Sequence, residues 1–347
     1  MSVVYKKLEE VCEILDSQRI PITAKDRKAG QYPYYGANGL QDHVAEYIFD
    51  DELVLLAEDG GNFGSVDRPI AYRVSGKCWV NNHAHVLKAK PCIDIDYLGY
   101  SLMFYDTSGL VNGATRQKLT QAAMREIKIP YREIDEQQEI VGKIDSVFSL
   151  IEKSQLELRR LDQLVKSRFV EMFGNPIKNT QNRPTTIFAD VVTMQRGFDL
   201  PVQDRQQDGT VPVYGSNGVL GHHNIAKVHG GGVITGRSGT IGKVFYAEGD
   251  FWPLNTSLFS VNTHGNNIVY LAYLLQMYNL SRFTEGTGVP TLNRNKFHGE
   301  QIIDIPRSEQ DSFAAFVSEV DKSKLAVKQS LEKLETLKKS LMQQYFG

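Results

Sequence analysis

The chain of 347 residues contains an internal duplication, and this duplication constrains its fold more than any other feature. Five blocks of the first half return in the same order in the second half. They are YPYYGANGL and VPVYGSNGV, LLAEDGGNFGSV and ITGRSGTIGKV, WVNN and WPLN, IKIP and IDIP, and LRRLDQLVKSRFVEMFG and LEKLETLKKSLMQQYFG. Partners lie between 173 and 179 residues apart along the chain. Because a repeat of this size encodes a repeated structural unit, we expect two copies of one domain.

Each copy begins with a strand-rich part, over residues 1–130 and 175–305. Short alternating or apolar runs such as LVLLA and KVFYA are separated there by Gly, Asn, Asp and Pro, which is typical of strands joined by turns. One helix is predicted in each part, over residues 97–105 and 268–278. The predicted fold class is therefore α+β, with two similar globular domains.

Each copy ends with a helical part, over residues 131–174 and 306–347. Apolar residues recur there in alternating steps of three and four, which predicts a coiled-coil seam. The seam residues are Val147, Ile151, Leu158, Leu161, Val165 and Met172 in the first helix, and Val317, Val320, Val327, Leu331, Leu334 and Leu341 in the second. Leu164 and Leu337 lie beside these seams and broaden the apolar stripe.

Two helices with such stripes are expected to pair with each other. Since each helix leads out of one globular copy, antiparallel pairing would place the two globular domains at opposite ends. At a rise of 1.5 Å per residue, the segment from Gln137 to Phe173 would reach about 55 Å. The helical pair is therefore predicted to act as a ruler between the domains.

Composition excludes several classes of protein. No run approaches the roughly 18 apolar residues that a membrane span needs, and the start MSVVYKKLEE does not resemble a signal peptide. Three unevenly spaced cysteines without a C-x-x-C motif predict a reducing, cytoplasmic location and no thiolate zinc site. The net charge is −2 and is balanced along the chain. If DNA is the partner, its phosphates must meet a local basic patch or a positive partner subunit.

The stretch GGGVITGRSGTIGK, from Gly230 to Lys243, invites comparison with phosphate-binding loops. A P-loop would need glycine where Arg237 stands and Ser or Thr where Val244 stands. A dinucleotide fingerprint also fails at Arg237, and the first copy carries Asp59 at the aligned position. The shared glycines are therefore predicted to shape the backbone of a loop. Two alternatives stay open: a nucleotide-binding enzyme that uses this loop, and a scaffold whose domains bind only peptides or sugars.

The paired blocks, together with IPYREIDEQQEIV and IPRSEQDSFAAFV, resemble the specificity (S) subunits of type I restriction-modification systems over essentially the whole chain. The resemblance implies target-recognition domains at 1–130 and 175–305, each reading half of a bipartite sequence of double-stranded DNA. It also implies helical spacer regions at 131–174 and 306–347 that form an antiparallel coiled coil.

The same resemblance implies partners and a division of labour. Two methyltransferase (M) subunits would dock on the coiled coil, and a restriction/translocase (R) subunit would join through them. The partners would carry out adenine methylation and cleavage, and the S subunit itself would catalyse nothing. No cofactor, metal or membrane is expected.

Candidate DNA contacts are polar and basic side chains on the loops, because these read base edges and phosphates. In the second copy they are Arg237, Ser238, Thr240, Lys243, Thr287, Asn293, Arg294 and Lys296. In the first copy they are Asn62, Ser65, Arg68, Thr115, Arg116, Gln117 and Lys118. The alternative is that Asn293 caps the following helix and that the basic residues pair with surface acids. Glu58 and Asp59 could accept from cytosine N4 or organise a turn.

Two small histidine clusters, NNHAH and GHHNIAKVH, raise the question of a metal. Neither has a nearby Cys or acidic third ligand at a recognisable spacing. Polar loop histidines are the favoured interpretation.

Overall fold

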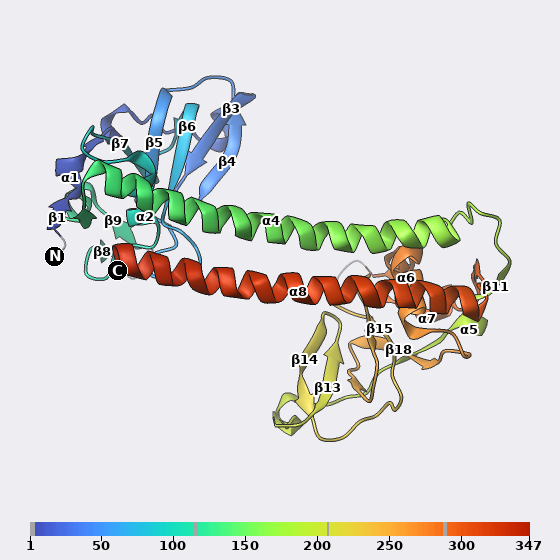
Figure 1. The fold of residues 1–347 in the computed structure, drawn as a ribbon. Helices are drawn as coiled ribbons and strands as arrows, with labels where there is room; N and C mark the ends of the chain where they lie inside the picture. Colours follow the sequence, from blue (N-terminus) through green and yellow to red (C-terminus); the bar gives the residue numbers. More distant parts are fainter. Residues whose placement is uncertain (1–3, 114–116, 207, 287–289) are drawn as a thin grey trace. The chain divides into compact units, whose positions relative to one another are not determined.

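A computed structural model describes residues 4–113, 117–206, 208–286 and 290–347 (Figure 1). The chain divides into two compact units. The first unit comprises Met1–Ser154 with Ser330–Gly347, and the second comprises Gln155–Gln329. Each unit therefore contains one strand-rich domain and parts of both long helices.

The first unit is built around a six-stranded sheet (Figure 1). In spatial order its strands are β2 (Cys12–Ile14), β7 (Ala84–Ala89), β5 (Phe49–Ala57), β6 (Ala71–Val80), β3 (Ala29–Gly36) and β4 (Gly39–Val44). All neighbours are antiparallel except β3 and β6, which pair in parallel over two residues, Tyr34 with Trp79 and Tyr35 with Val80. The ten-residue strand β6 holds the sheet together, since it pairs with β5 along most of its length and with β3 at its end.

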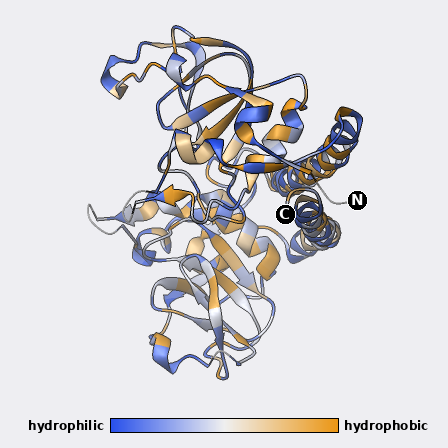
Figure 2. Ribbon diagram, turned by 90° about the vertical axis from the view of Figure 1, so that its left-hand side faces the viewer, coloured by the Kyte–Doolittle hydropathy of each residue, from blue (hydrophilic) through white to orange (hydrophobic). Residues whose placement is uncertain are grey.

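Smaller elements close one end of this sheet. They are β1 (Val4–Lys7) paired with β10 (Lys128–Tyr131), β8 (Val111–Asn112) paired with β9 (Lys118–Leu119), the helices α1 (Leu8–Val11), α2 (Ile95–Met103) and α3 (Gln121–Arg125), and the 3-10 turns Asp16–Gln18 and Ala24–Asp26. The buried face of α2 packs on the sheet, where Tyr97 and Leu98 join Val54 and Leu56 in one core cluster. Figure 2 shows the hydrophobic residues concentrated on such strands and short helices, whereas the loops are largely hydrophilic.

The second unit repeats this strand order but divides it between two sheets. One sheet has the order β12 (Thr193–Arg196), β18 (Ser257–Asn262), β15 (Gly232–Gly236) and β16 (Val244–Ala247), and the other has β14 (Gly218–His223), β13 (Val211–Gly215) and β17 (Trp252–Pro253). The counterpart of β6 is interrupted by residues 248–251, so that β16 and β17 are separate strands. Without one continuous strand, the two sheets are not joined.

The remaining elements of the second unit match those of the first. They are β11 (Thr185–Ile187) paired with β21 (Gln301–Ile303), β19 (Thr284–Glu285) paired with β20 (Thr291–Leu292), the helices α5 (Phe188–Val191), α6 (Ile268–Tyr278) and α7 (Arg294–Phe297), and the 3-10 turns Val202–Asp204 and Leu280–Phe283. The predicted helices at 97–105 and 268–278 are confirmed as α2 and α6, and the mixture of helices and strands confirms the α+β class.

The long helices are α4 (Ile134–Phe173) and α8 (Arg307–Phe346), each of 40 residues (Figure 1). The predicted seam is confirmed, because every residue assigned to it is buried or partly buried. Leu164 and Leu337 do not extend it, since 46% and 45% of their surfaces are exposed. No helix within the described ranges combines the length and hydropathy required to cross a bilayer.

Contacts inside each unit show that the helices run antiparallel there. In the second unit the end of α4 meets the start of α8, where the rings of Phe169 and Phe313 lie 5.5 Å apart and Lys324 Nζ lies 2.8 Å from Asp162 Oδ1. In the first unit the end of α8 meets the start of α4, where Lys338 Nζ lies 5.6 Å from the ring of Phe148.

Both helices also complete the domain cores. Phe169 and Phe173 of α4 and Phe313 of α8 are fully buried in the core of the second unit. In the first unit, Ile140 and Ile144 of α4 are buried in the core, and the last turns of α8 pack against it. The helices are thus built into each domain and are not loosely attached to it.

A buried glutamine anchors each long helix to its domain. In the first unit, Gln137 Oε1 accepts from the backbone N–H of Asp94 at 2.7 Å, and its Nε2 donates to the carbonyl of Arg132 at 2.7 Å. In the second unit, Gln310 Oε1 accepts from the N–H of Asn267 at 2.8 Å. Asp94 and Asn267 cap the N-termini of α2 and α6. The same anchor therefore recurs in both units.

Candidate nucleic-acid interface

The glycine loop of the second unit begins with Arg237, directly after β15. Backbone hydrogen bonds fix this residue on both sides. Its N–H donates to the carbonyl of Thr256 at 2.8 Å, and its carbonyl accepts from the N–H of Leu292 at 2.7 Å. Arg237 is therefore held between the loop that precedes β18 and the strand β20.

The first unit holds Glu58 in the same way. Its N–H donates to the carbonyl of His83 at 2.8 Å, and its carbonyl accepts from the N–H of Leu119 at 2.7 Å. Arg237 thus corresponds to Glu58, and not to Asp59 as the alignment of the two sequences predicts. The alignment is wrong by one residue at this point, and the structural register places an acid opposite an arginine.

The glycines of both loops meet backbone requirements, as their shared spacing predicts. Gly60 and Gly239 have φ angles of 63° and 81°, in the left-handed region that favours glycine. A Cβ on Gly236 would lie 1.8 Å from the carbonyl oxygen of Thr240, so this position has no space for a side chain. The structural register also pairs Gly239 with Gly60, one residue before the glycine that the sequence alignment selected.

The repeated Tyr-Gly-x-Asn-Gly motif supports these loops. Asn38, at the tip of the β3–β4 hairpin, donates to the carbonyl of Gly60 at 3.0 Å. In the second unit, Lys243 Nζ donates to Oδ1 of Asn217 at the tip of the β13–β14 hairpin, at 2.8 Å. In both units the hairpin tip contacts the glycine loop, which explains why the two motifs recur together.

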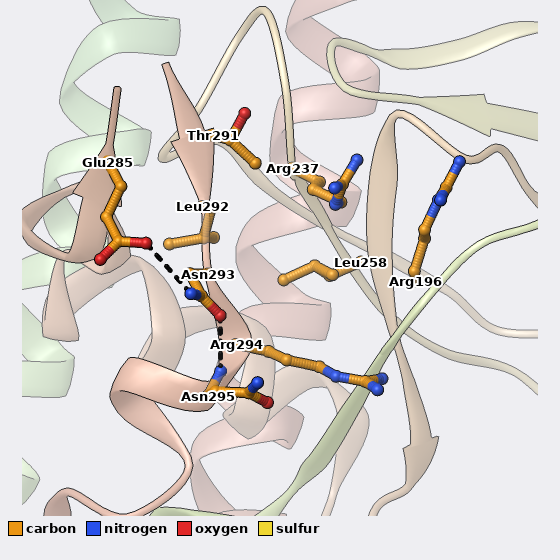
Figure 3. Close-up of a pocket in the computed structure, with 9 residues that line it drawn as sticks. All are labelled: Arg196, Arg237, Leu258, Glu285, Thr291, Leu292, Asn293, Arg294 and Asn295. Carbon is orange, nitrogen blue, oxygen red and sulfur yellow. Dashed lines mark hydrogen bonds between the residues drawn. The ribbon is translucent and has the colours of Figure 1, made fainter. Parts of the chain in front are cut away.

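A cavity of about 340 Å³ opens beside the glycine loop of the second unit (Figure 3). It is lined by Arg196, Arg237, Leu258, Glu285, Thr291, Leu292, Asn293, Arg294 and Asn295. The three arginines come from the end of β12, the start of the glycine loop and the start of α7. Strand pairing brings them together, since Leu258 of β18 is opposite both Arg196 and Thr235. Figure 3 shows the three guanidinium groups on one side of the cavity.

The three arginines differ in their contacts. Arg294 Nη1 donates to the carbonyl of Met194 at 3.3 Å. Among the described residues, the side chains of Arg196 and Arg237 have no hydrogen bond or ion pair. Arg196 is exposed and Arg237 is partly exposed. Two guanidinium groups are therefore available to a ligand.

The opposite side of the cavity carries an acid, Glu285 (Figure 3). Asn293 Nδ2 donates to Glu285 Oε2 at 3.0 Å, and Lys296 Nζ lies 3.0 Å from Oε1. The hydrogen bonds from Asn293 and Lys296 lower the pKa of Glu285, so the carboxylate is charged at neutral pH. Asn293 also caps α7 by accepting from the N–H of Asn295 at 3.1 Å. Asn293 and Lys296 thus have the local roles that the sequence analysis considered as the alternative to DNA contact.

In the first unit, the corresponding space is occupied by ion pairs. Asp16, two residues after Ile14, is the counterpart of Arg196, which lies two residues after Met194. Arg19 Nη1 lies 2.7 Å from Glu58 Oε2, and the two side chains are only 12% and 13% exposed. Lys118 Nζ lies 3.0 Å from Glu58 Oε1. Each charge at this position is therefore compensated within the domain.

A buried histidine completes this network. His85, the counterpart of Leu258, lies with Nδ1 2.6 Å from Asp16 Oδ2 and with Nε2 2.9 Å from the carbonyl of Leu119. Burial raises the pKa of Asp16, but the hydrogen bonds with His85 and the N–H of Val86 outweigh it, and the net pKa is lowered. Burial likewise raises the pKa of Glu58, and its hydrogen bonds with Arg19 and Lys118 lower the net value.

Asp16, Glu58 and His85 lie close enough to hold a metal ion, with ligand atoms within 4.8 Å of one another. Their hydrogen bonds argue for another role. Asp16 accepts from the N–H of Val86 at 2.9 Å as well as bonding His85, and Glu58 is engaged by two cations. This cluster is an internal ion network.

The other predicted contact residues lie on the same loops. Asn62 Nδ2 donates to the carbonyl of Pro69 at 3.3 Å, and Ser65 Oγ accepts from the N–H of Arg68 at 2.9 Å, so both shape a turn. Ser238 forms a bridge with Thr291 in the second unit. Thr240 is partly exposed, and Arg68 and Gln117 are exposed. Thr115, Arg116 and Thr287 lie outside the described residues.

Sequence reasoning missed Arg196 and Asn295 as cavity residues. Arg196 lies far from the glycine loop in the sequence and outside every repeated block. Arg196 lies near Arg237 because β12 and β15 both pair with β18. No motif or repeat in the sequence pointed to Arg196.

The fold and these sites define a duplicated recognition protein, in which one backbone framework displays different side chains in its two copies. The model of the type I restriction modification DNA specificity domain matches residues 2–160 and 188–337, and the chain belongs to this family. It is a specificity subunit that recognises DNA sequence, and it is not itself an enzyme.

Relatives and solved structures agree with this assignment. A Haemophilus influenzae protein described as a type I restriction enzyme specificity subunit is 26% identical, over 98% of this chain and 95% of its own length. A Mycoplasma pneumoniae type I specificity subunit is 23% identical, over 89% and 87%. The crystal structure of the S subunit of a type I restriction-modification system from M. genitalium shares the fold, with a TM-score of 0.65 at 14% identity, covering 100% of this chain and 96% of that chain.

Proposed function

We propose that each strand-rich domain reads one half of a bipartite DNA target and that the two long helices set the spacing between the halves. The domains would be residues 1–130 and 175–305, and the helical spacers 131–174 and 306–347. Two M subunits dock on the helical pair, and an R subunit joins through them. The complex then methylates adenines within the target sequence that this chain recognises, or cleaves the DNA. The protein acts in the cytoplasm.

One observation carries this proposal. Arg237 and Glu58 occupy the same backbone position in the two units, with the same pair of hydrogen bonds, but have opposite charges. A framework that is retained while its displayed side chains change suits two domains that read different sequences. The antiparallel contacts inside each unit support the helical pair, and a structure from a study of type I complex assembly shares the fold at a TM-score of 0.57 and 13% identity.

The DNA contacts are proposed on the loops around the cavity and on their counterparts. In the second domain they are Arg196, Arg237, Ser238, Thr240, Lys243 and Arg294, together with Asn293 and Lys296, which have further N–H donors besides those bound to Glu285. Thr287, which lies outside the described residues, is proposed from the sequence alone. In the first domain they are Asn62, Ser65, Arg68, Gln117 and Lys118. Thr115 and Arg116, which lie outside the described residues, are proposed from the sequence alone. Phosphate contacts would position the domain, and base contacts would specify the sequence.

Exchange of one domain tests this proposal. The chain is co-expressed with the M subunits of its own system, and methylated adenines are mapped across a genome by single-molecule sequencing. The expected result is a bipartite motif. Replacement of residues 1–130 by the equivalent domain of a relative should change one half of the motif only. A change in both halves, or an absence of any motif, would contradict the proposal.

The spacer has its own test. Insertion of one heptad between residues 150 and 165 should lengthen the unspecified gap between the two half-sites, because the domains would be moved apart along the DNA. The same mapping experiment measures the gap. An unchanged gap would show that the helices do not set the spacing.

A further inference from the structure

The second domain offers one feature that the first does not: uncompensated guanidinium groups inside a cavity. We propose that Arg196 and Arg237 read a guanine in the half-site of the second domain. This inference rests on the proposed function, and it names the base class that the cavity selects.

The available donors are the first support. Arg196 and Arg237 line the same cavity, and neither side chain has a hydrogen bond or ion pair with another described residue. A guanidinium group presents two parallel N–H donors, which match the O6 and N7 acceptors of guanine in the major groove. The third arginine, Arg294, already donates to the carbonyl of Met194 and so links α7 to β12.

The position of the arginines favours direct readout. Leu258 is 2% exposed and forms an apolar floor between them. Arg237 is fixed by two backbone hydrogen bonds, at 2.8 and 2.7 Å, and its loop is further held by the hairpin tip through Lys243 and Asn217. This fixed backbone places the Arg237 side chain at the edge of the cavity, and its unpaired guanidinium can align with the acceptors of a base when DNA binds.

The acid across the cavity argues against a phosphate ligand. Glu285 lies opposite the guanidinium groups, and its carboxylate is ionised (Figure 3). Lys296 pairs with this carboxylate, but a phosphate only accepts hydrogen bonds and would leave the remaining acceptor sites of Glu285 unused, whereas a base pair presents both acceptors and donors. In a G·C pair the acceptors of guanine lie beside the N4 donor of cytosine. A cavity with arginines on one side and a carboxylate on the other matches that pattern.

The test uses the complex of the full chain with its M subunits. Four variants are compared with the wild type: Arg196→Ala, Arg237→Ala, Arg237→Lys and Arg282→Ala. The last removes an exposed arginine of the same unit that is outside the cavity, where its guanidinium stacks 4.3 Å from the ring of Tyr278. Binding is measured by competition with a library of DNA sites, and methylation motifs are mapped. Circular dichroism and thermal unfolding confirm that each variant is folded.

The wild-type motif should contain an invariant guanine in the half-site that changes when residues 175–305 are exchanged. Arg196→Ala and Arg237→Ala should reduce the preference for guanine at that position about tenfold to a hundredfold, and leave the other half-site unchanged. Arg237→Lys should keep general DNA affinity but weaken the preference, because lysine keeps the charge and lacks the planar fork that matches O6 and N7 together. Arg282→Ala should leave the motif intact.

Three outcomes would overturn the inference. One is a second half-site without guanine. Another is a uniform loss of affinity with an unchanged motif, which marks phosphate contacts. The third is full rescue by Arg237→Lys. Each of these leaves a bipartite motif whose halves change separately when one domain is exchanged, whereas failure of the proposed function would leave no motif or would change both halves together.

Discussion

The two domains have the same backbone arrangement at the start of the glycine loop, but the side chains at this position carry opposite charges. In the first domain Glu58 forms ion pairs with Arg19 and Lys118, and Asp16 contacts His85. In the second domain Arg237 lines a cavity without a side-chain partner among the described residues. The difference shows that one position can either stabilise a domain or remain available for a ligand, while the hydrogen bonds of the backbone stay the same.

The largest expected effect follows directly from this contrast. Glu58→Ala leaves the nearly buried guanidinium of Arg19 without its shorter ion pair, and should lower the free energy of unfolding by about 3 kcal/mol. Arg237→Ala, at the equivalent position, breaks no side-chain hydrogen bond or ion pair with the described residues and should change stability by less than about 0.5 kcal/mol. Chemical denaturation of both variants measures the difference. Similar losses for the two would show that Arg237 is also a structural residue.

The sequence predicts the framework well because its signals are local. The duplication, the strand-rich composition and the heptad seam can each be recognised within short windows. The predicted seam residues are confirmed. Leu164 and Leu337 are the exceptions beside the seam, because their exposure depends on the exact face that the partner helix covers. Periodicity identifies a stripe but does not determine its width.

The sites are predicted less well because they depend on register and on distant pairing. Two adjacent glycines, Gly60 and Gly61, fit the sequence alignment equally, and only the backbone shows that Gly60 adopts the left-handed conformation of Gly239. The pairing of Arg237 with Glu58 follows from that register. The cavity itself requires Arg196, which strand pairing brings from a distant part of the chain. A single sequence carries no local sign of either feature.

A second, smaller effect should be shared by the two domains. Gln137→Leu and Gln310→Leu each remove a buried amide and leave the N–H of a helix cap, Asp94 or Asn267, without its acceptor. Each should cost about 2 kcal/mol of stability. Hydrogen exchange of the amides in α2 and α6 localises the loss. A matching loss in both variants would show that the anchors are part of the common framework, whereas a loss in only one would separate the two copies.

The smallest expected effect is a difference in acid sensitivity. The pKa values of Asp16 and Glu58 are lowered in the folded first domain, so both acids contribute stability above their unfolded pKa values. That contribution is lost as the pH falls through the lowered values, because protonation removes the attraction to Arg19, Lys118 and His85. At the equivalent positions the second domain has arginines, which do not titrate in this range.

Hydrogen exchange at pH 7 and near pH 3, below the ordinary pKa values of both acids, checks this difference, with protection of β5 and β7 compared with that of β15 and β18. The first pair of strands should lose more protection as the pH falls, because only these strands adjoin the acidic network. Asp16→Asn is the matched control, since it removes one titrating group and should flatten the dependence in β7. An equal loss in both domains, or a larger loss in β15 and β18, would show that the ion network does not set the acid sensitivity of the first domain.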